Sequence, residues 1–168
     1  MEVILVLHNI RSCYNVGAIL RTGEGFGVTK VVLSGYTPRV HDKNLLPHLR
    51  EKLDKEIHKT ALGAEEMLDI QESEDIIATV NELRADGWQV VGLENNIDSG
   101  KLYDLNDVKL SDVLGRKVVL VLGEEVNGIE PRLRDEIEVF VQIPMRGKKE
   151  SFNVSVATGI ALYGIMCV

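Results

Sequence analysis

The 168-residue chain has only two cysteines and no excess of basic residues, and each shortage excludes a class of protein. Cys13 and Cys167 lie far apart and neither belongs to a C-x-x-C pair, so we expect no zinc site, no disulfide framework and a reducing, cytoplasmic environment. The formal net charge is -7, whereas proteins that coat nucleic acid carry clustered Lys and Arg. Any contact with a nucleic acid must therefore be local or supplied by a partner.

The sequence also lacks a signal peptide and a long uninterrupted hydrophobic run. Residues 1–7 are apolar, but they include Glu2 and have neither a basic flank nor a cleavage pattern, so they predict a strand. Residues 151–168 carry no charge, which raises a C-terminal membrane anchor as an alternative. Asn153, Thr158 and Gly164 interrupt a segment already shorter than the roughly 20 apolar residues that a span needs. We expect a buried or interface helix and no membrane contact.

Short apolar runs rich in β-branched residues alternate with helical segments, which is typical of an α/β fold. The runs cover residues 3–7, 31–33, 90–93, 118–122 and 139–143. Because some are apolar at every position, we expect a mostly parallel central sheet with helices on both faces. Helices are predicted at residues 15–26, at 74–86, from Pro131 and from near Asn153, with 98–114 a long connection. The length favours a single domain over residues 1–168, without an added RNA-binding domain.

Residues 39–59 form a polar stretch that holds six Lys or Arg residues and three of the four histidines. A solvated loop with a short helix explains this composition, and an RNA-contacting insertion is the alternative. The histidines have no i, i+4 pair, which makes a metal site improbable. The acidic run in residues 65–75 should repel phosphate.

A first motif, N-V-G-A-I-L-R, places Asn15 at the mouth of a helix and Arg21 almost two turns along it. A helix N-cap and a solvated arginine would explain these two residues. The functional alternative is that Gly17 and Ala18 let another chain or a ligand approach, while Arg21 offers a charged fork for phosphate.

Two further motifs follow buried strands. Residues 122–128, L-G-E-E-V-N-G, come after the most apolar strand, at the end where ligands of open α/β sheets bind; a tight turn with exposed acids is the alternative. In residues 143–157, Pro144 stops a strand, a basic loop follows, and Ser151 or Asn153 caps the last helix. A basic loop that leads into a helix N-terminus favours an anion such as phosphate.

Together these segments resemble the signatures of the SpoU-like (TrmH) family of SPOUT RNA 2′-O-ribose methyltransferases. The matching segments are N-x-G-A-I-x-R, L-G-x-E-x-x-G, and I-P-M followed by S-F-N-V-S-V-A, in that order, with Phe152 where leucine is usual. The resemblance covers the chain from Asn9 to the last helix. It implies a C-terminal trefoil knot, a homodimer formed through the C-terminal helix, and S-adenosylmethionine as cofactor. The implied cofactor-binding residues are Leu93, Leu122, Gly123, Ile143, Met145 and Phe152.

The resemblance also implies the reaction, in which a ribose 2′ oxygen takes the methyl group from a sulfonium. Arg21 is the central residue, from the same subunit or its neighbour, and Glu124 holds its fork. A guanidinium has a pKa above about 12, so we expect it to bind phosphate and stabilise the alkoxide, while the proton leaves through the phosphate or a strongly perturbed Arg21. The catalytic set implied is Arg21, Asn15, Glu124, Ser151 and Asn153, and the RNA contacts are Arg11, Arg21, Arg146, Lys148 and Lys149.

Several alternatives stay open at this point. We expect transfer RNA rather than ribosomal RNA as the substrate, because the chain has no added recognition module. A non-catalytic RNA or nucleotide binder on the same fold is a second hypothesis. A third, an unrelated α/β regulator, would bind ATP or NAD in place of S-adenosylmethionine.

Overall fold

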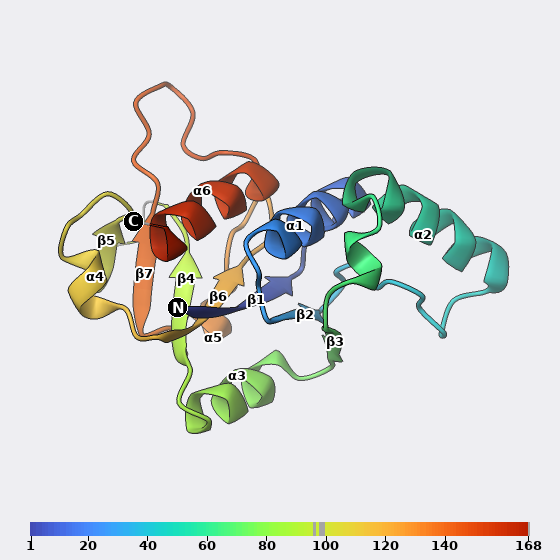
Figure 1. Cartoon of the computed structure of the whole chain (residues 1–168), viewed down its shortest axis with the longest axis horizontal. Helices are drawn as coiled ribbons and strands as arrows, with labels where there is room; N and C mark the ends of the chain where they lie inside the picture. Colours follow the sequence, from blue (N-terminus) through green and yellow to red (C-terminus); the bar gives the residue numbers. More distant parts are fainter. Residues whose placement is uncertain (96, 98–99, 168) are drawn as a thin grey trace.

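A computed structural model of the chain describes residues 1–95, 97 and 100–167. Within these ranges seven strands alternate with helices (Figure 1). The strands are β1 (Glu2–His8), β2 (Lys30–Ser34), β3 (Ile70–Ser73), β4 (Gln89–Leu93), β5 (Leu102–Asp104), β6 (Lys117–Leu122) and β7 (Val139–Gln142). The helices are α1 (Cys13–Gly25), α2 (Pro47–Ala61), α3 (Ile76–Ala85), α4 (Leu110–Val113), α5 (Pro131–Arg134) and α6 (Val154–Met166), with a 3-10 turn, η1 (Ala64–Glu66).

All strand pairs of the sheet are parallel, in the order β3-β2-β1-β6-β4-β7-β5. β1 and β6 lie at its centre, where Leu7 is in register with Leu33 on one side and Leu122 on the other. The predicted parallel sheet is therefore confirmed. The trefoil knot implied by the resemblance stays a prediction.

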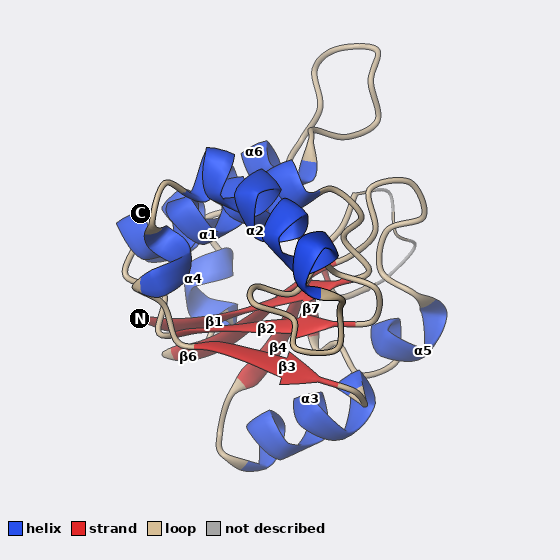
Figure 2. Ribbon diagram, turned by 90° about the vertical axis from the view of Figure 1, so that its right-hand side faces the viewer, coloured by secondary structure: helices blue, strands red, loops and turns tan. Residues whose placement is uncertain are grey.

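Helices cover both faces of the sheet, which explains the strands that are apolar at every position (Figure 2). Val3, Leu5 and Leu7 point into a core packed against α1 and α6, while Ile4 and Val6 point into a second core with α3 and α5. All five side chains are at most 2% exposed. Because alternate residues of a strand face opposite sides, each central strand contributes to both cores.

Two strands, β3 and β5, were not predicted from the sequence, and each lies at an edge of the sheet. In β3 the middle residues Gln71 and Glu72 are exposed, and β5 has only three residues, all partly buried. Edge strands need little apolar surface, so their sequences carry a weak signal. Consequently residues 98–114, predicted as one long connection, contain β5 and α4, and the helix predicted from residue 74 begins at Ile76 with Asp75 as its N-cap.

α1 packs tightly against α2 through Gly17. A Cβ atom at this position would lie 2.2 Å from the carbonyl oxygen of Ile57 and 2.3 Å from the hydroxyl of Thr60. The glycine of the first motif is thus required by the contact between the two helices. α1 also packs against α6.

No helix within the described ranges is both long and apolar enough to cross a membrane. α6, the uncharged C-terminal helix, has 13 residues. It buries Thr158, Ala161, Leu162 and Ile165, while Val156 and Tyr163 are exposed. Of the predicted buried or interface helix, the structure confirms a helix that is buried along one side, and the interface stays a prediction.

Candidate active site

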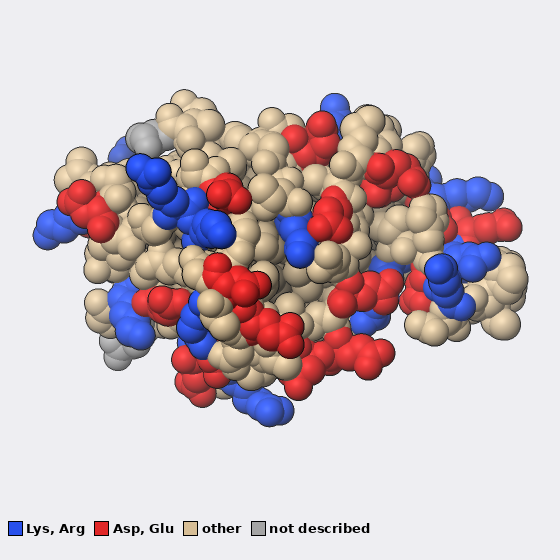
Figure 3. Space-filling view, turned by 60° about the horizontal axis from the view of Figure 1, so that its bottom comes forward, with Lys and Arg blue, Asp and Glu red and all other residues tan. Residues whose placement is uncertain are grey.

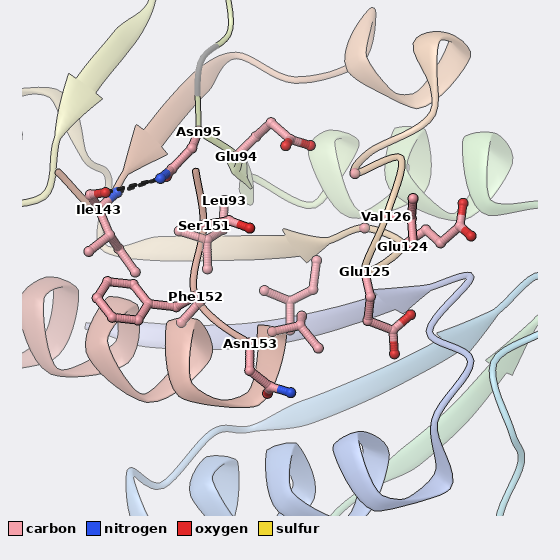
Figure 4. Close-up of a pocket in the computed structure, with 15 residues that line it drawn as sticks. Leu93, Glu94, Asn95, Glu124, Glu125, Val126, Ile143, Ser151, Phe152 and Asn153 are labelled. Carbon is pink, nitrogen blue, oxygen red and sulfur yellow. Dashed lines mark hydrogen bonds between the residues drawn. The ribbon is translucent and has the colours of Figure 1, made fainter. Parts of the chain in front are cut away.

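The carboxyl ends of β4, β6 and β7, which are neighbours in the sheet, enclose a pocket of about 170 Å³ (Figure 4). Ligands of open α/β sheets bind at this end of the strands. Leu93, Leu122 and Ile143 form its apolar wall at the strand ends. The remaining walls come from residues 94–95, the loop at 123–128 and residues 151–157, including Gly123, Glu124, Ser151, Phe152 and Asn153.

The loop at residues 123–128 is closed on itself. The N–H of Glu124 donates to the carbonyl oxygen of Gly128 at 2.9 Å, and the N–H of Gly128 donates back to Glu124 at 2.9 Å. A Cβ atom on Gly123 would lie 2.3 Å from backbone atoms of Gly128 and Ile129, and Gly128 has a φ of 68°, in the left-handed region that favours glycine. Both glycines of the second motif are therefore demanded by the shape of the pocket wall.

Two residues directly after β4 join the loops around the pocket. The side-chain amide of Asn95 donates to the carbonyl oxygen of Ile143 and accepts from the N–H of Ile143, both at 3.1 Å (Figure 4). Glu94 accepts the N–H of Ile129 at 2.7 Å, and burial raises the pKa of its carboxyl group. Neither residue was predicted, although both follow a buried strand at the end where ligands bind.

A chain of side-chain hydrogen bonds links α6, α1 and the pocket loop. Asn153 donates to Asn15 at 3.1 Å, and Asn15 donates to Glu125 at 3.0 Å. Glu125 also accepts the backbone N–H groups of Arg11 and Ser12. Since Ser12 is the N-cap of α1, the N-cap explanation of Asn15 is wrong, and its side chain is available to the site. Asn153 does cap α6.

Glu124 pairs with a different arginine from the one predicted. The guanidinium of Arg11 lies 2.5 Å from the Glu124 carboxylate, whose side chain is 10% exposed, and Asn127 donates to the same carboxylate at 2.6 Å. The expected contact between Glu124 and Arg21 of the same chain is therefore not formed. This proximity could have been predicted from the sequence, because Arg11 follows β1 at the same edge of the sheet as the pocket loop that follows β6.

Arg21 and Met145 lie outside the pocket. Arg21 is exposed and lines a second depression, between α1 and α2, together with Thr22 and Lys59. It follows Asn15 by six residues, or roughly 9 Å along the helix. Met145 lines a third depression with Lys148 and Lys149. These two lysines and Arg146 are exposed on the loop between β7 and α6, which stands out from the body of the molecule (Figure 1).

Comparisons with known proteins identify the family. A model of the SpoU rRNA Methylase family matches residues 2–163. The chain belongs to this family. It is 32% identical over 161 residues to the 23S rRNA (guanosine-2'-O-)-methyltransferase RlmB of Xylella fastidiosa, covering 96% of this chain and 57% of that protein. It is 30% identical over 163 residues to an uncharacterized tRNA/rRNA methyltransferase of Borreliella burgdorferi, covering 96% of this chain and 62% of that protein.

The fold of this SpoU-family chain matches solved structures. It resembles the AdoMet-bound rRNA methyltransferase from Sinorhizobium meliloti with a TM-score of 0.78 and 25% identity, over 97% of this chain and 55% of that one. The chain spans less than two thirds of the length of each of these three relatives. The family predicted from the three motifs and the α/β fold predicted from the alternating apolar runs are both confirmed.

The Glu125 carboxyl gives the site a pH dependence that can be measured. Burial raises its pKa, but hydrogen bonds from Asn15, Arg11 and Ser12 outweigh this and lower the pKa below its ordinary value of 4.5. A carboxyl with a lowered pKa contributes stability that is present above its unfolded pKa and lost as pH falls through the folded one. The difference in melting temperature between the wild type and Glu125→Gln should therefore shrink below about pH 4.5.

Glu94 supplies a matched control of opposite sign. Because the pKa of Glu94 is raised in the folded state, ionisation of this carboxyl group lowers the stability of the folded protein. The wild type should lose stability relative to Glu94→Gln as pH rises above about 4.5 towards the raised pKa of the folded state. Scanning calorimetry of both variants over this range checks the pair, and differences independent of pH would contradict these environments.

Proposed function

We propose that this protein transfers the methyl group of S-adenosylmethionine to a ribose 2′-hydroxyl of RNA. The observation that carries the proposal is the lining of the strand-end pocket. It combines an apolar wall with three carboxylates, Glu94, Glu124 and Glu125, and no Lys or Arg of the described residues lines it. Such a lining suits the apolar and cationic parts of a sulfonium amino-acid nucleoside, whereas it would repel the phosphates of ATP or NAD.

The chain's own residues would orient the acceptor. When bound, S-adenosylmethionine supplies an electrophilic methyl group. A ribose hydroxyl is a poor nucleophile until its proton is being removed, so groups that hold it in line and stabilise its oxygen accelerate the reaction. Asn153, Ser151 and Asn15 lie at or beside the pocket with donors and acceptors that can orient the hydroxyl. Arg21 would bind the adjacent phosphate and stabilise the alkoxide.

Arg21 lies outside the pocket of its own chain, which favours a dimer in which a second subunit supplies this arginine. On α6, Val156, Ile160 and Tyr163 follow each other at i, i+4 and i+7, so they share one face, and they are 50%, 36% and 59% exposed. Three exposed apolar side chains on one helix face favour a partner. The proposed homodimer packs through this face of α6 and brings Arg21 of the partner to the pocket.

A charge on this face should dissociate the dimer. We expect Val156→Glu to weaken dimerisation by about 100-fold, because an unpaired carboxylate would be buried at the contact. Light scattering coupled to size exclusion measures the mass. Val108→Glu, at a position 86% exposed and far from α6 in sequence, is the control and should stay dimeric. A monomeric wild type would contradict the dimer, and an unchanged Val156→Glu mass would contradict this interface.

The RNA substrate is the finer part of the proposal. The sequence favours transfer RNA, while the Xylella relative is named for 23S ribosomal RNA, which makes ribosomal RNA the second candidate. Mapping of 2′-O-methylated positions in cellular RNA with and without the protein distinguishes them. Loss of a single methylated position in one RNA class is expected. An unchanged map together with binding of S-adenosylmethionine would favour the non-catalytic RNA binder.

A further inference from the structure

α2 extends away from the core of the molecule, and burial explains only one end of it (Figure 1). Its fully buried residues are Ile57 and Ala61, in its second half. At the opposite end Leu46 and Leu49 are 61% and 44% exposed. The first two turns thus contribute little apolar burial, and some other role must account for a helix of 15 residues.

His41 bridges this extended helix and η1 through two carboxylates. Its backbone N–H and its Nδ1 contact the carboxylate of Asp54 in α2 at 2.8 and 3.1 Å, and its Nε2 lies 2.8 Å from Glu66 in η1. The two carboxylates, Glu66 first, raise the pKa of His41. The bridge links α2 to η1 and occupies one of the acids of α2, in addition to the close packing of α2 against α1 at Gly17.

One exposed face of α2 carries a row of bases, which we call the basic ridge: Lys52, Lys55 and Lys59. Their spacing of three and four residues aligns them on the same side of the helix. None of the three forms an ion pair with a described residue, whereas Arg39 and Arg84 elsewhere do. Acids are interleaved with this row, since Glu51 precedes Lys55 and Lys52 precedes Glu56 by four residues, and opposite charges at this spacing support the helix.

The ridge continues the depression that holds Arg21. Lys59 lines that depression and also the neighbouring one, whose other walls include His48, Lys52 and Lys55. Glu51 and Glu56 also line this neighbouring depression. Burial, and then the nearby Glu56, raise the pKa of Cys13. We call these two adjoining depressions the groove; from residue 48 to residue 59 it follows roughly 16 Å of α2.

Figure 3 shows how the charged side chains are distributed over one face of the molecule. There the acidic and basic side chains of the described residues are interspersed, with acids gathered across the middle, and they form no broad basic surface. An acidic protein of net charge -7 can hold a polyanion only where bases are locally concentrated.

We propose that the basic ridge binds backbone phosphates of the substrate RNA beside the methylated nucleotide. The proposal rests on the proposed function, because Arg21 at one end of the groove marks where the reacting ribose and its phosphate lie. Lysines act as point charges, and phosphate contacts set position without reading sequence. The ridge therefore sets the register of the RNA strand on α2. In the proposed dimer, the pocket of the partner subunit acts on the nucleotide at the Arg21 end of the ridge.

The test compares two triple variants of equal charge. One carries Lys52→Gln, Lys55→Gln and Lys59→Gln; the control carries Lys109→Gln, Arg116→Gln and Arg132→Gln, all exposed and remote from α2 in sequence. The probe is fluorescein-labelled unfractionated tRNA, with fragmented ribosomal RNA as a second probe, and anisotropy is titrated at several KCl concentrations. The ridge variant should lose about tenfold or more in affinity and flatten the slope of log K against log salt by about 2.

Two results would overturn the proposal: equal affinities and slopes for the two triple variants, or a wild type that binds neither probe. Lys55→Gln alone should flatten the slope by about 0.7, which keeps the test valid if the triple variant folds poorly. Calorimetric binding of S-adenosylmethionine and methyl transfer by the wild type test the proposed function separately, since RNA binding through the ridge can persist where methyl transfer is absent.

Discussion

Replacing Arg21 with alanine is expected to abolish methyl transfer to RNA while leaving binding of S-adenosylmethionine nearly unchanged. The loss should be at least about 10³-fold, because the change removes a charged donor aimed at developing negative charge. Cofactor affinity should stay within about twofold, since Arg21 lies outside the strand-end pocket of its own chain and the proposal assigns it to the RNA phosphate and the alkoxide, away from the cofactor. Transfer of tritiated methyl to RNA measures the first quantity and calorimetry the second.

Two further variants sharpen the Arg21 test. Arg21→Lys keeps the charge but loses the planar fork, so it should recover only part of the activity. Arg132→Ala removes an exposed arginine on α5 and should transfer methyl at the wild-type rate. Full activity of Arg21→Ala would sink the assignment. Loss of cofactor binding in the same variant would place Arg21 in the cofactor site instead.

Gly123→Val is expected to eliminate binding of S-adenosylmethionine. Any Cβ atom there would lie within 2.5 Å of backbone atoms of Gly128 and Ile129, and the backbone cannot yield as a flexible side chain could. The closed loop must therefore open, and the wall of the pocket is displaced. We expect cofactor affinity to fall by about 100-fold or more, with methyl transfer lost in proportion.

Gly147 provides the matched control for this substitution. A Cβ atom at Gly147 would have no neighbour within 4 Å, and the residue lies in the exposed loop before α6. Gly147→Val should bind the cofactor as the wild type does. Circular dichroism of both variants separates a local change from unfolding. Wild-type cofactor affinity in a folded Gly123→Val protein would show that the cofactor binds elsewhere.

The central part of the fold could be predicted because burial on two faces leaves an unambiguous sequence. β1 and β6 are apolar at nearly every position, and only a strand covered on both sides needs such a composition. β3 and β5 could not be predicted, since edge strands satisfy their pairing with one neighbour and tolerate exposed Gln71 and Glu72. The polar composition of α2 concealed a long helix for the same reason, because most of it faces solvent.

The motifs predicted several residues that the structure brings together at one pocket, and they did not predict the contacts among them. Leu93, Gly123 and Phe152 line one pocket because the ends of neighbouring parallel strands meet at one edge. The pairing of Glu124 with Arg11 and the bridging role of Asn95 depend on which loops converge in space, and residue spacing carries no such information. All catalytic, cofactor-binding and RNA-binding roles, including those of Arg21, Met145 and the basic loop, stay predictions.

Nucleoside analysis of RNA, after incubation with the purified protein and S-adenosylmethionine labelled in its methyl group, shows directly whether a ribose is methylated. We expect the label in 2′-O-methylated nucleosides, at one position of one RNA class, and none with Arg21→Ala. Label on a base, or cofactor binding without any labelled nucleoside in transfer or ribosomal RNA, would contradict the proposed function.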